Sequence, residues 1–157
     1  MTERGVIGGL AIWSHFSKPG PVARVTLSRM NHLDSTSPLA GVQRTDFVSL
    51  PVQDMPRAKA FYRDTLELLS PDWDANWPEL ETGNVSLYLV DPTEMGIPFA
   101  PHTAPLALRV EDVAAARNAL ERRGVTFTGE HDSGVCNMAF FQDPEGNSLM
   151  LHHRYAP

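Results

Sequence analysis

Two short segments of the chain alternate strictly between apolar and polar positions. The first reads DFVSLPVQD and the second PLALRVED. A two-residue period is typical of a β-strand with one buried face. The apolar positions are Val48, Leu50 and Val52 in the first segment and Leu106, Leu108 and Val110 in the second. We therefore predict two strands, each with one face in a core.

A helical pattern follows each predicted strand. Asp54 and Asp112 stand where a helix N-cap belongs, because an aspartate oxygen can accept from the first free backbone N–H groups. The first helix is predicted over residues 55–69, where Ser70-Pro71 ends it, and the second over 113–123, where Gly124 ends it. The apolar stripe expected on the first helix is Ala58, Phe61, Tyr62, Leu66 and Leu69.

The two segments are related by an internal repeat. A constant offset of 58 residues pairs identical side chains at four positions. The pairs are Leu50 with Leu108, Val52 with Val110, Asp54 with Asp112 and Ala58 with Ala116. The sequence therefore predicts one unit used twice, which is the usual meaning of self-similarity at a fixed spacing.

Each unit continues with strand-like runs after its helix. The first has candidates at residues 79–82 and 84–91, and the second has VTFTG, VCNMAFF and NSLMLHH. We predict an α+β fold in which strand, helix and about three strands occur twice, as repeat one (45–91) and repeat two (104–155). A single helix covers one face of a sheet, so the other face must be covered by a partner or line a cavity.

The first 43 residues have a different character. They contain turn signals, Lys18-Pro19-Gly20-Pro21 among them, and one possible short strand at residues 22–27. We expect an N-terminal extension over 1–43, in front of a domain spanning 44–157.

Charge and composition argue against a nucleic-acid-binding protein and against a membrane-spanning one. The chain carries a formal net charge of −6, which argues against a nucleic-acid surface. It has no apolar run of the roughly 18 residues that a membrane span requires. Its single cysteine, Cys136, rules out an internal disulfide and fits a reducing compartment, so we predict a cytoplasmic protein with Cys136 in the core.

Two motifs carry a family resemblance. The first helix contains Ala-Phe-Tyr-Arg-Asp-Thr-Leu, and the last two strands are joined by Phe-Gln-Asp-Pro-Glu-Gly-Asn. With the doubled unit, they resemble the vicinal oxygen chelate superfamily, which includes glyoxalases, extradiol dioxygenases, fosfomycin-resistance enzymes and bleomycin-binding proteins. The resemblance implies two βαβββ units, a small-molecule ligand and a homodimer.

The resemblance also bears on metal binding. In the metal enzymes of that superfamily the ligands come from four strand positions, which carry over onto Phe47, Leu87, Pro105 and Met150 here. None of these side chains suits a hard divalent ion, which takes imidazole or carboxylate ligands. We therefore predict no metal and no cofactor. The less favoured alternative is a relocated site built from His152 and His102 with one further ligand, for which Glu79, Glu81 and His131 are candidates.

Polar side chains on the predicted open face are candidate catalytic residues. Strand parity places Arg109 opposite Leu108 and Val110, and His152 on the same face as Met150. A guanidinium there could hold an anionic group and an imidazole could transfer a proton. The alternative for each is an ordinary surface or ion-paired residue.

The same faces supply candidate ligand-binding residues. Phe47, Leu87 and Met150 would form an apolar lining or simply fill a smaller core, and Ser49 could donate one hydrogen bond. Trp77, in the polar loop PDWDANWPE, would close the mouth of a pocket or anchor the loop. In the Asp143-Pro144-Glu145-Gly146-Asn147 turn, we expect Asp143 and Glu145 to be solvated.

Two function classes follow. The favoured one is a metal-independent protein that binds a small hydrophobic or aromatic molecule, as bleomycin-binding relatives do. The alternative is an enzyme, either a lyase or isomerase working by acid–base catalysis or a dioxygenase-type member with a relocated metal. The sequence does not identify the ligand.

Overall fold

The structure, a computed structural model, describes residues 41–157. The predicted N-terminal extension and its possible strand at 22–27 lie outside the described residues, apart from the last positions of the extension. Residues 42–157 form one unit, to which the following description applies.

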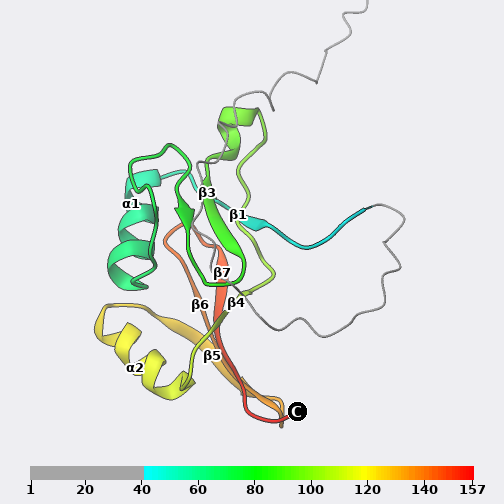
Figure 1. Cartoon of the computed structure of the whole chain (residues 1–157). Coiled ribbons are helices and arrows are strands. Elements are labelled where there is room, and N and C mark those ends of the chain that lie inside the picture. Colours follow the sequence, from blue (N-terminus) through cyan, green and yellow to red (C-terminus); the bar gives the residue numbers. More distant parts are fainter. Residues whose placement is uncertain (1–40) are drawn as a thin grey trace, which may run out of the picture. The chain divides into compact units, whose positions relative to one another are not determined.

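The unit contains two modules, each with a small sheet and a helix (Figure 1). The first module consists of β1 (Phe47–Pro51), α1 (Met55–Ala60), η2 (Phe61–Thr65), β2 (Glu79–Leu80) and β3 (Ser86–Val90). The short turn η3 (Pro92–Met95) begins the connection to the second module. The second module consists of β4 (Leu106–Arg109), α2 (Val113–Arg122), β5 (Phe127–Asp132), β6 (Cys136–Gln142) and β7 (Ser148–Arg154).

The two sheets share a topology. In the first, β1 pairs parallel with β3, and β2 pairs antiparallel with β3, in the order β1-β3-β2. In the second, β4 pairs parallel with β7 in the order β4-β7-β6-β5. The predicted α+β arrangement of two related units is confirmed. The first module has two strands after its helix, and an isolated bridge between Leu69 and Glu81 stands where a third would pair.

Both predicted helix caps are present. The Asp54 side chain accepts from the Arg57 N–H at 3.1 Å, and the Asp112 side chain accepts from the Ala115 N–H at 2.9 Å. The second helix ends as expected, with Gly124 at φ +89°. No helix in residues 41–157 is long and apolar enough to cross a membrane.

The first helix ends earlier than predicted. Its second half is the π-helix η2, in which the Leu66 N–H bonds to the Phe61 carbonyl five residues back. The wider turn shifts the phase of the apolar stripe, and Glu67 then adopts φ +57°, which stops the helix. Leu69, predicted on the buried stripe, is therefore 73% exposed.

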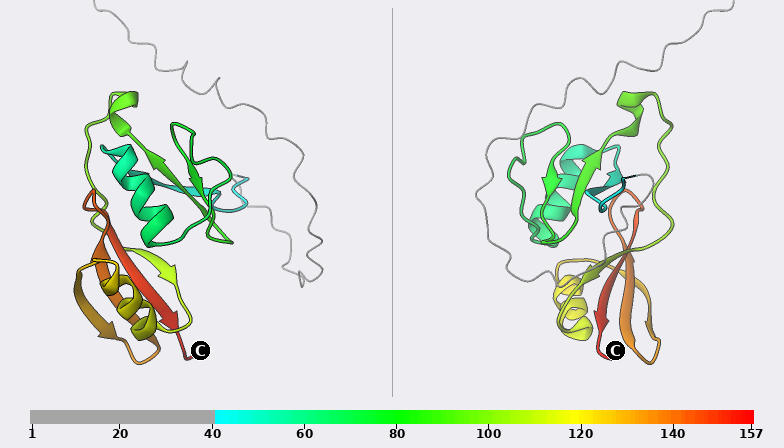
Figure 2. Two further views of the ribbon diagram at one scale, coloured as in Figure 1. Left: turned by 90° about the vertical axis from the view of Figure 1, so that its left-hand side faces the viewer. Right: turned by 45° about the vertical axis from the view of Figure 1, so that its right-hand side comes forward.

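Both helices cover the same side of their sheets, as the left panel of Figure 2 shows. Apolar side chains of both modules meet beneath them in one core. The largest fully buried members are Tyr62, Phe141, Leu50, Leu80, Leu89, Leu149 and Val52. Cys136, predicted in the core, is only half-buried. Within residues 41–157, the opposite side of each sheet carries no helix, and we call it the open face.

The turn between β6 and β7 joins the modules, which corrects the expectation of solvated carboxylates. Asp143 is 5% exposed, and its Oδ2 accepts from the Tyr62 hydroxyl of η2 at 2.8 Å. Asn147 is fully buried and donates to the Asp143 carboxylate and to the Pro51 carbonyl at the end of β1. The polar side chains of the turn are therefore part of the interior.

Glu145 in the same turn is also bound to the first module. Its side chain is 2% exposed and accepts from the backbone N–H of Gln53 at 2.8 Å and from the Arg57 guanidinium at 2.6 Å. Burial alone would raise the pKa of Glu145, but these donors, with the Asp54 N–H, outweigh it and hold the pKa below its usual range. The three side chains Asp143, Glu145 and Asn147, which we call the turn clamp, fix the two modules to each other.

Candidate functional site

The open face of the first sheet carries a row of side chains across three strands. Ser49 on β1 aligns with Tyr88 on β3, and Tyr88 aligns with Glu79 on β2. Because aligned residues in a sheet share a face, these three lie together on the side away from α1. Phe47 stands beside them and is 44% exposed.

Tyr88 is the centre of this row. Its ring meets the Phe47 ring edge-on, with the centroids 5.0 Å apart. Its hydroxyl donates to Glu79 Oε2 at 2.7 Å. Burial, followed by the hydrogen bond to Glu79 and the charge of that carboxylate, raises the pKa of Tyr88 to about 12. Tyr88 therefore stays protonated and keeps donating at neutral pH.

The open face of the second sheet carries the two predicted catalytic residues. Arg109 on β4 aligns with His152 on β7, so their side chains are neighbours on one face. Arg109 is exposed and His152 half-buried. Next to them, Met150 aligns with Ala107 on one side and with Phe140 on the other, and Met138 aligns with His152. The arrangement is an apolar floor of two thioethers and one ring, with a cation and an imidazole beside it.

Leu87 corrects one of the predicted site positions. It was expected to line the open face, but it is 3% exposed and packs in the core with Val48, its partner on β1. A shift of one residue along a strand reverses the face, so the open-face neighbour is Tyr88. The alternation in Ser86-Leu87-Tyr88-Leu89 carried this signal, since its two leucines belong with the core.

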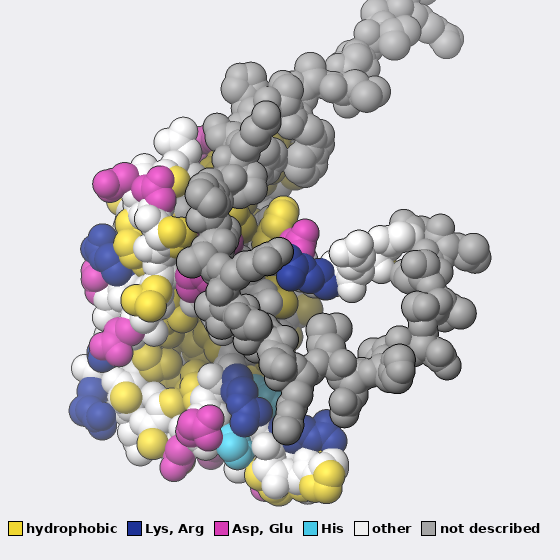
Figure 3. Space-filling view, in the orientation of Figure 1, with side chains coloured by type: hydrophobic (Ala, Val, Ile, Leu, Met, Phe, Trp, Pro, Cys, Tyr) yellow, Lys and Arg dark blue, Asp and Glu magenta, His cyan; other side chains and the backbone are white. Residues whose placement is uncertain are grey.

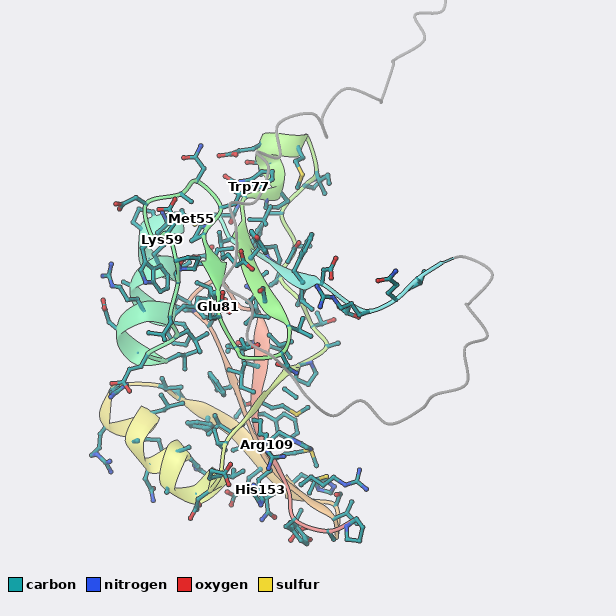
Figure 4. All side chains as sticks on the ribbon, in the orientation of Figure 1. Met55, Lys59, Trp77, Glu81, Arg109 and His153 are labelled. Carbon is teal, nitrogen blue, oxygen red and sulfur yellow. The ribbon has the colours of Figure 1, made fainter. Side chains whose placement is uncertain are left out.

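Trp77 does not lie with the other predicted site residues. It is half-buried in the loop after η2 and donates from its indole nitrogen to Glu94 of η3 at 3.1 Å. In Figure 4 it stands beside η3, well away from Arg109 on β4. The contact with Glu94 supports the loop-anchor alternative over the pocket-mouth role.

A cavity of about 680 Å³ lies between the modules at the free edge of β4. Apolar side chains of both modules line it, and Arg109 stands at its margin. Hydrophobic side chains are visible in the hollow between α1 and α2 in Figure 3. At one end, Arg123, the residue that follows α2, donates to the Thr65 carbonyl at 2.7 Å and pairs with Glu67. Arg109 thus has access to both the open face and this cavity.

The donor groups in the described residues do not fit a metal site. Phe47, Pro105 and Met150 offer no ligand for a hard divalent ion. Tyr88, found on the open face where Leu87 was expected, has its pKa raised to about 12 and donates its hydroxyl proton to Glu79. Within residues 41–157, no three side chains of His, Cys, Asp or Glu lie close enough to hold a metal ion. The histidines of the relocated site, His102 and His152, are therefore not brought together with a carboxylate.

Comparison with known proteins places the fold. Residues 44–151 match the profile of the Glyoxalase/Bleomycin resistance protein/Dioxygenase superfamily. TnmS3, an antibiotic binding protein from Streptomyces sp. CB03234, is 29% identical with a TM-score of 0.60, and the alignment covers 72% of this chain and 97% of TnmS3. A glyoxalase/bleomycin resistance protein from the same organism is 32% identical with a TM-score of 0.55, over 70% of this chain and all (100%) of that one.

A lactoylglutathione lyase from Agrobacterium tumefaciens has a TM-score of 0.59 at 21% identity, over 71% of this chain and 93% of the lyase, and shows the fold alone. No curated protein matches the chain. The family resemblance seen in the sequence is confirmed by these matches.

Proposed function

Because the chain belongs to the Glyoxalase/Bleomycin resistance protein/Dioxygenase superfamily, we propose that it is a metal-independent protein that binds a small hydrophobic or aromatic molecule. The open faces of the two sheets carry this proposal. They combine aromatic rings and thioethers with polar side chains that can orient a ligand, Ser49, Arg109 and His152 among them, as small-molecule sites do. The residues concerned are Phe47 and Tyr88 on the first sheet and Met138, Phe140 and Met150 on the second.

The binding site is completed by a second copy of the chain. Neither open face is covered by a helix of the described residues, and apolar side chains left in contact with water favour association. β1 and β4 each also have one unpaired edge, and an unpaired edge is a place where another chain can add. A homodimer would bring two such faces together around one ligand. A cytoplasmic location is part of the proposal, because a chain with a single cysteine fits a reducing compartment.

Arg109 and His152 bind the polar part of the ligand in this proposal, and Ser49 adds one hydrogen bond. The alternative function is an acid–base lyase or isomerase. The alignment of Arg109 with His152 favours it, because an anion clamp next to an imidazole is the pair that such catalysis needs. An enzyme of this class would accelerate proton exchange next to a carbonyl of its ligand, and a His152→Asn variant would lose that acceleration.

The binding function is tested with a neutral aromatic probe, anthracene methanol, followed by its fluorescence anisotropy. We expect saturable binding that a chelator leaves unchanged. About one probe should bind for each pair of open faces that the dimer brings together. Phe47→Ala and Met150→Ala should each weaken binding by about tenfold, which corresponds to about 1.4 kcal/mol. Met95→Ala is the matched control, since Met95 is 37% exposed and lies in η3, outside both sheets.

Light scattering after size exclusion measures the oligomeric state of the same samples. The proposal requires a dimer with the mass of two chains. A monomer that binds no probe would refute the proposed function, and binding that depends on added divalent metal would refute its metal independence.

A further inference from the structure

Glu79 is a half-buried carboxylate on the first open face, and the exposed Glu81 lies near the same tyrosine, Tyr88. We propose that the Glu79–Tyr88 pair is the anchor for a protonated amine of the ligand, so that the preferred ligands are aromatic molecules carrying an organic cation. This inference rests on the proposed binding function and names the chemistry of one wall of that site.

Only one of the two carboxylate oxygens of Glu79 accepts a hydrogen bond from the described residues. Glu79 Oε2 accepts from the Tyr88 hydroxyl at 2.7 Å, which fixes the position of the carboxylate on the face. Among the described residues, Glu79 has no Lys, Arg or His within ion-pair distance, and its Oε1 accepts no hydrogen bond. One oxygen is therefore held in place while the other remains able to accept from a ligand.

A half-buried carboxylate is stabilised further by a counter-charge or by additional hydrogen-bond donors, because it has lost part of its hydration. Removing a carboxylate from water is unfavourable unless a cation or several hydrogen-bond donors compensate it. For the carboxylates of the turn clamp the protein itself supplies the donors. Satisfying the Tyr88 hydroxyl alone does not require a charge, because a neutral amide oxygen can also accept from it, although more weakly. A cation brought by the ligand supplies the missing compensation.

The neighbouring rings favour the same kind of ligand. Phe47 and Tyr88 meet edge-on next to the carboxylate, and aromatic faces attract ammonium groups. A ring with an acid beside it is thus suited to a cation carried on an aromatic scaffold. The net charge of −6 also raises the local concentration of cations at the chain surface.

The experiment uses three fluorescent probes with the same anthracene ring, carrying an aminomethyl, a hydroxymethyl or a carboxylate group. Affinities are measured for the full chain at neutral pH. We expect the aminomethyl probe to bind at least about tenfold more tightly than the hydroxymethyl probe. Glu79→Gln, which retains an acceptor for Tyr88, should remove the preference for the amine and leave the affinity for the hydroxymethyl probe unchanged.

Glu121→Gln is the matched control, because it removes the same charge from the exposed surface of α2, where Glu121 pairs with Arg117. It should leave the preference intact. Equal affinity for all three probes, or a preference for the carboxylate, would overturn the inference while leaving the binding function standing. A loss of dimerisation in Glu79→Gln without a change in preference would also overturn it, because Glu79 would then be an interface residue. Absence of binding by every probe would refute the proposed function itself.

Discussion

Removing the Tyr62 hydroxyl tests the turn clamp most sharply. Tyr62 is fully buried, and its hydroxyl donates to Asp143 Oδ2 at 2.8 Å across a sequence separation of 81 residues. Tyr62→Phe deletes this one donor and leaves the ring, its packing and the rest of the network in place. A hydrogen bond to a buried charged acceptor contributes about 1.5–3 kcal/mol, so we expect the free energy of unfolding to fall by about 2 kcal/mol.

Other hydrogen-bond donors to Asp143 limit the loss of unfolding free energy in this variant. The carboxylate also accepts from the N–H groups of Glu145 at 2.9 Å and Asn147 at 2.8 Å and from the Asn147 side chain at 2.8 Å. The variant should therefore fold, with an unchanged slope of unfolding free energy against urea. With a slope of about 2 kcal/mol per molar urea, the midpoint should move down by about 1 M, as measured by circular dichroism.

Tyr155→Phe is the matched control. Its hydroxyl also donates to an aspartate, Asp132, at 2.6 Å, but the tyrosine is 47% exposed. Water replaces that bond when it is deleted, so the cost should stay below about 0.5 kcal/mol. If both variants lose the same amount, or if Tyr62→Phe loses less than about 0.5 kcal/mol, the turn clamp does not stabilise the joined modules as described.

Three further predictions concern the same unit. Glu145→Gln should destabilise the protein most at neutral pH: the pKa of Glu145 is lowered on folding from an ordinary value of 4.5, so its contribution is present above that value and fades as the pH falls below it. Urea titrations at several pH values should show the unfolding free energies of wild type and variant converging in acid. A difference in unfolding free energy that does not change with pH would contradict this. Gly146→Ala should cost about 1–2 kcal/mol, because the residue has φ +87°, and a melting temperature equal to the wild type would refute it. Exhaustive chelation should leave the melting temperature unchanged, whereas a fall reversed by one divalent metal would disprove metal independence.

Patterns among residues close in sequence were sufficient to predict the main strands and helices of the fold. The alternation through Val48, Leu50 and Val52 and the two capping aspartates depend on neighbours in sequence, and each appears as expected in β1, α1 and α2. The repeat at one offset then predicted that β4 would follow the same course as β1. Such features are readable because their partners lie within a few residues.

The turn clamp was not readable in this way. The partners of Glu145 lie 88 to 92 residues away in the sequence, and a Pro-Glu-Gly turn has the composition of any exposed turn. The π-helix at Phe61–Thr65 was also missed, because a single widened turn leaves the residue types of an ordinary helix unchanged. The Glu79–Tyr88 pair was missed because Leu87 was expected on the open face. That expectation set the predicted faces of β3 one residue out of phase.

The central claim, binding of an aromatic molecule on the open faces, is tested most directly by nuclear magnetic resonance of methionine methyl groups. Of the six methionines, Met138 and Met150 lie on the second open face, while Met55 and Met95 lie in α1 and η3. Titration with the aminomethyl anthracene probe should shift the methyl signals of Met138 and Met150 by ring currents and leave those of Met55 and Met95 in place. Unchanged Met138 and Met150 signals in the presence of bound probe would contradict the account.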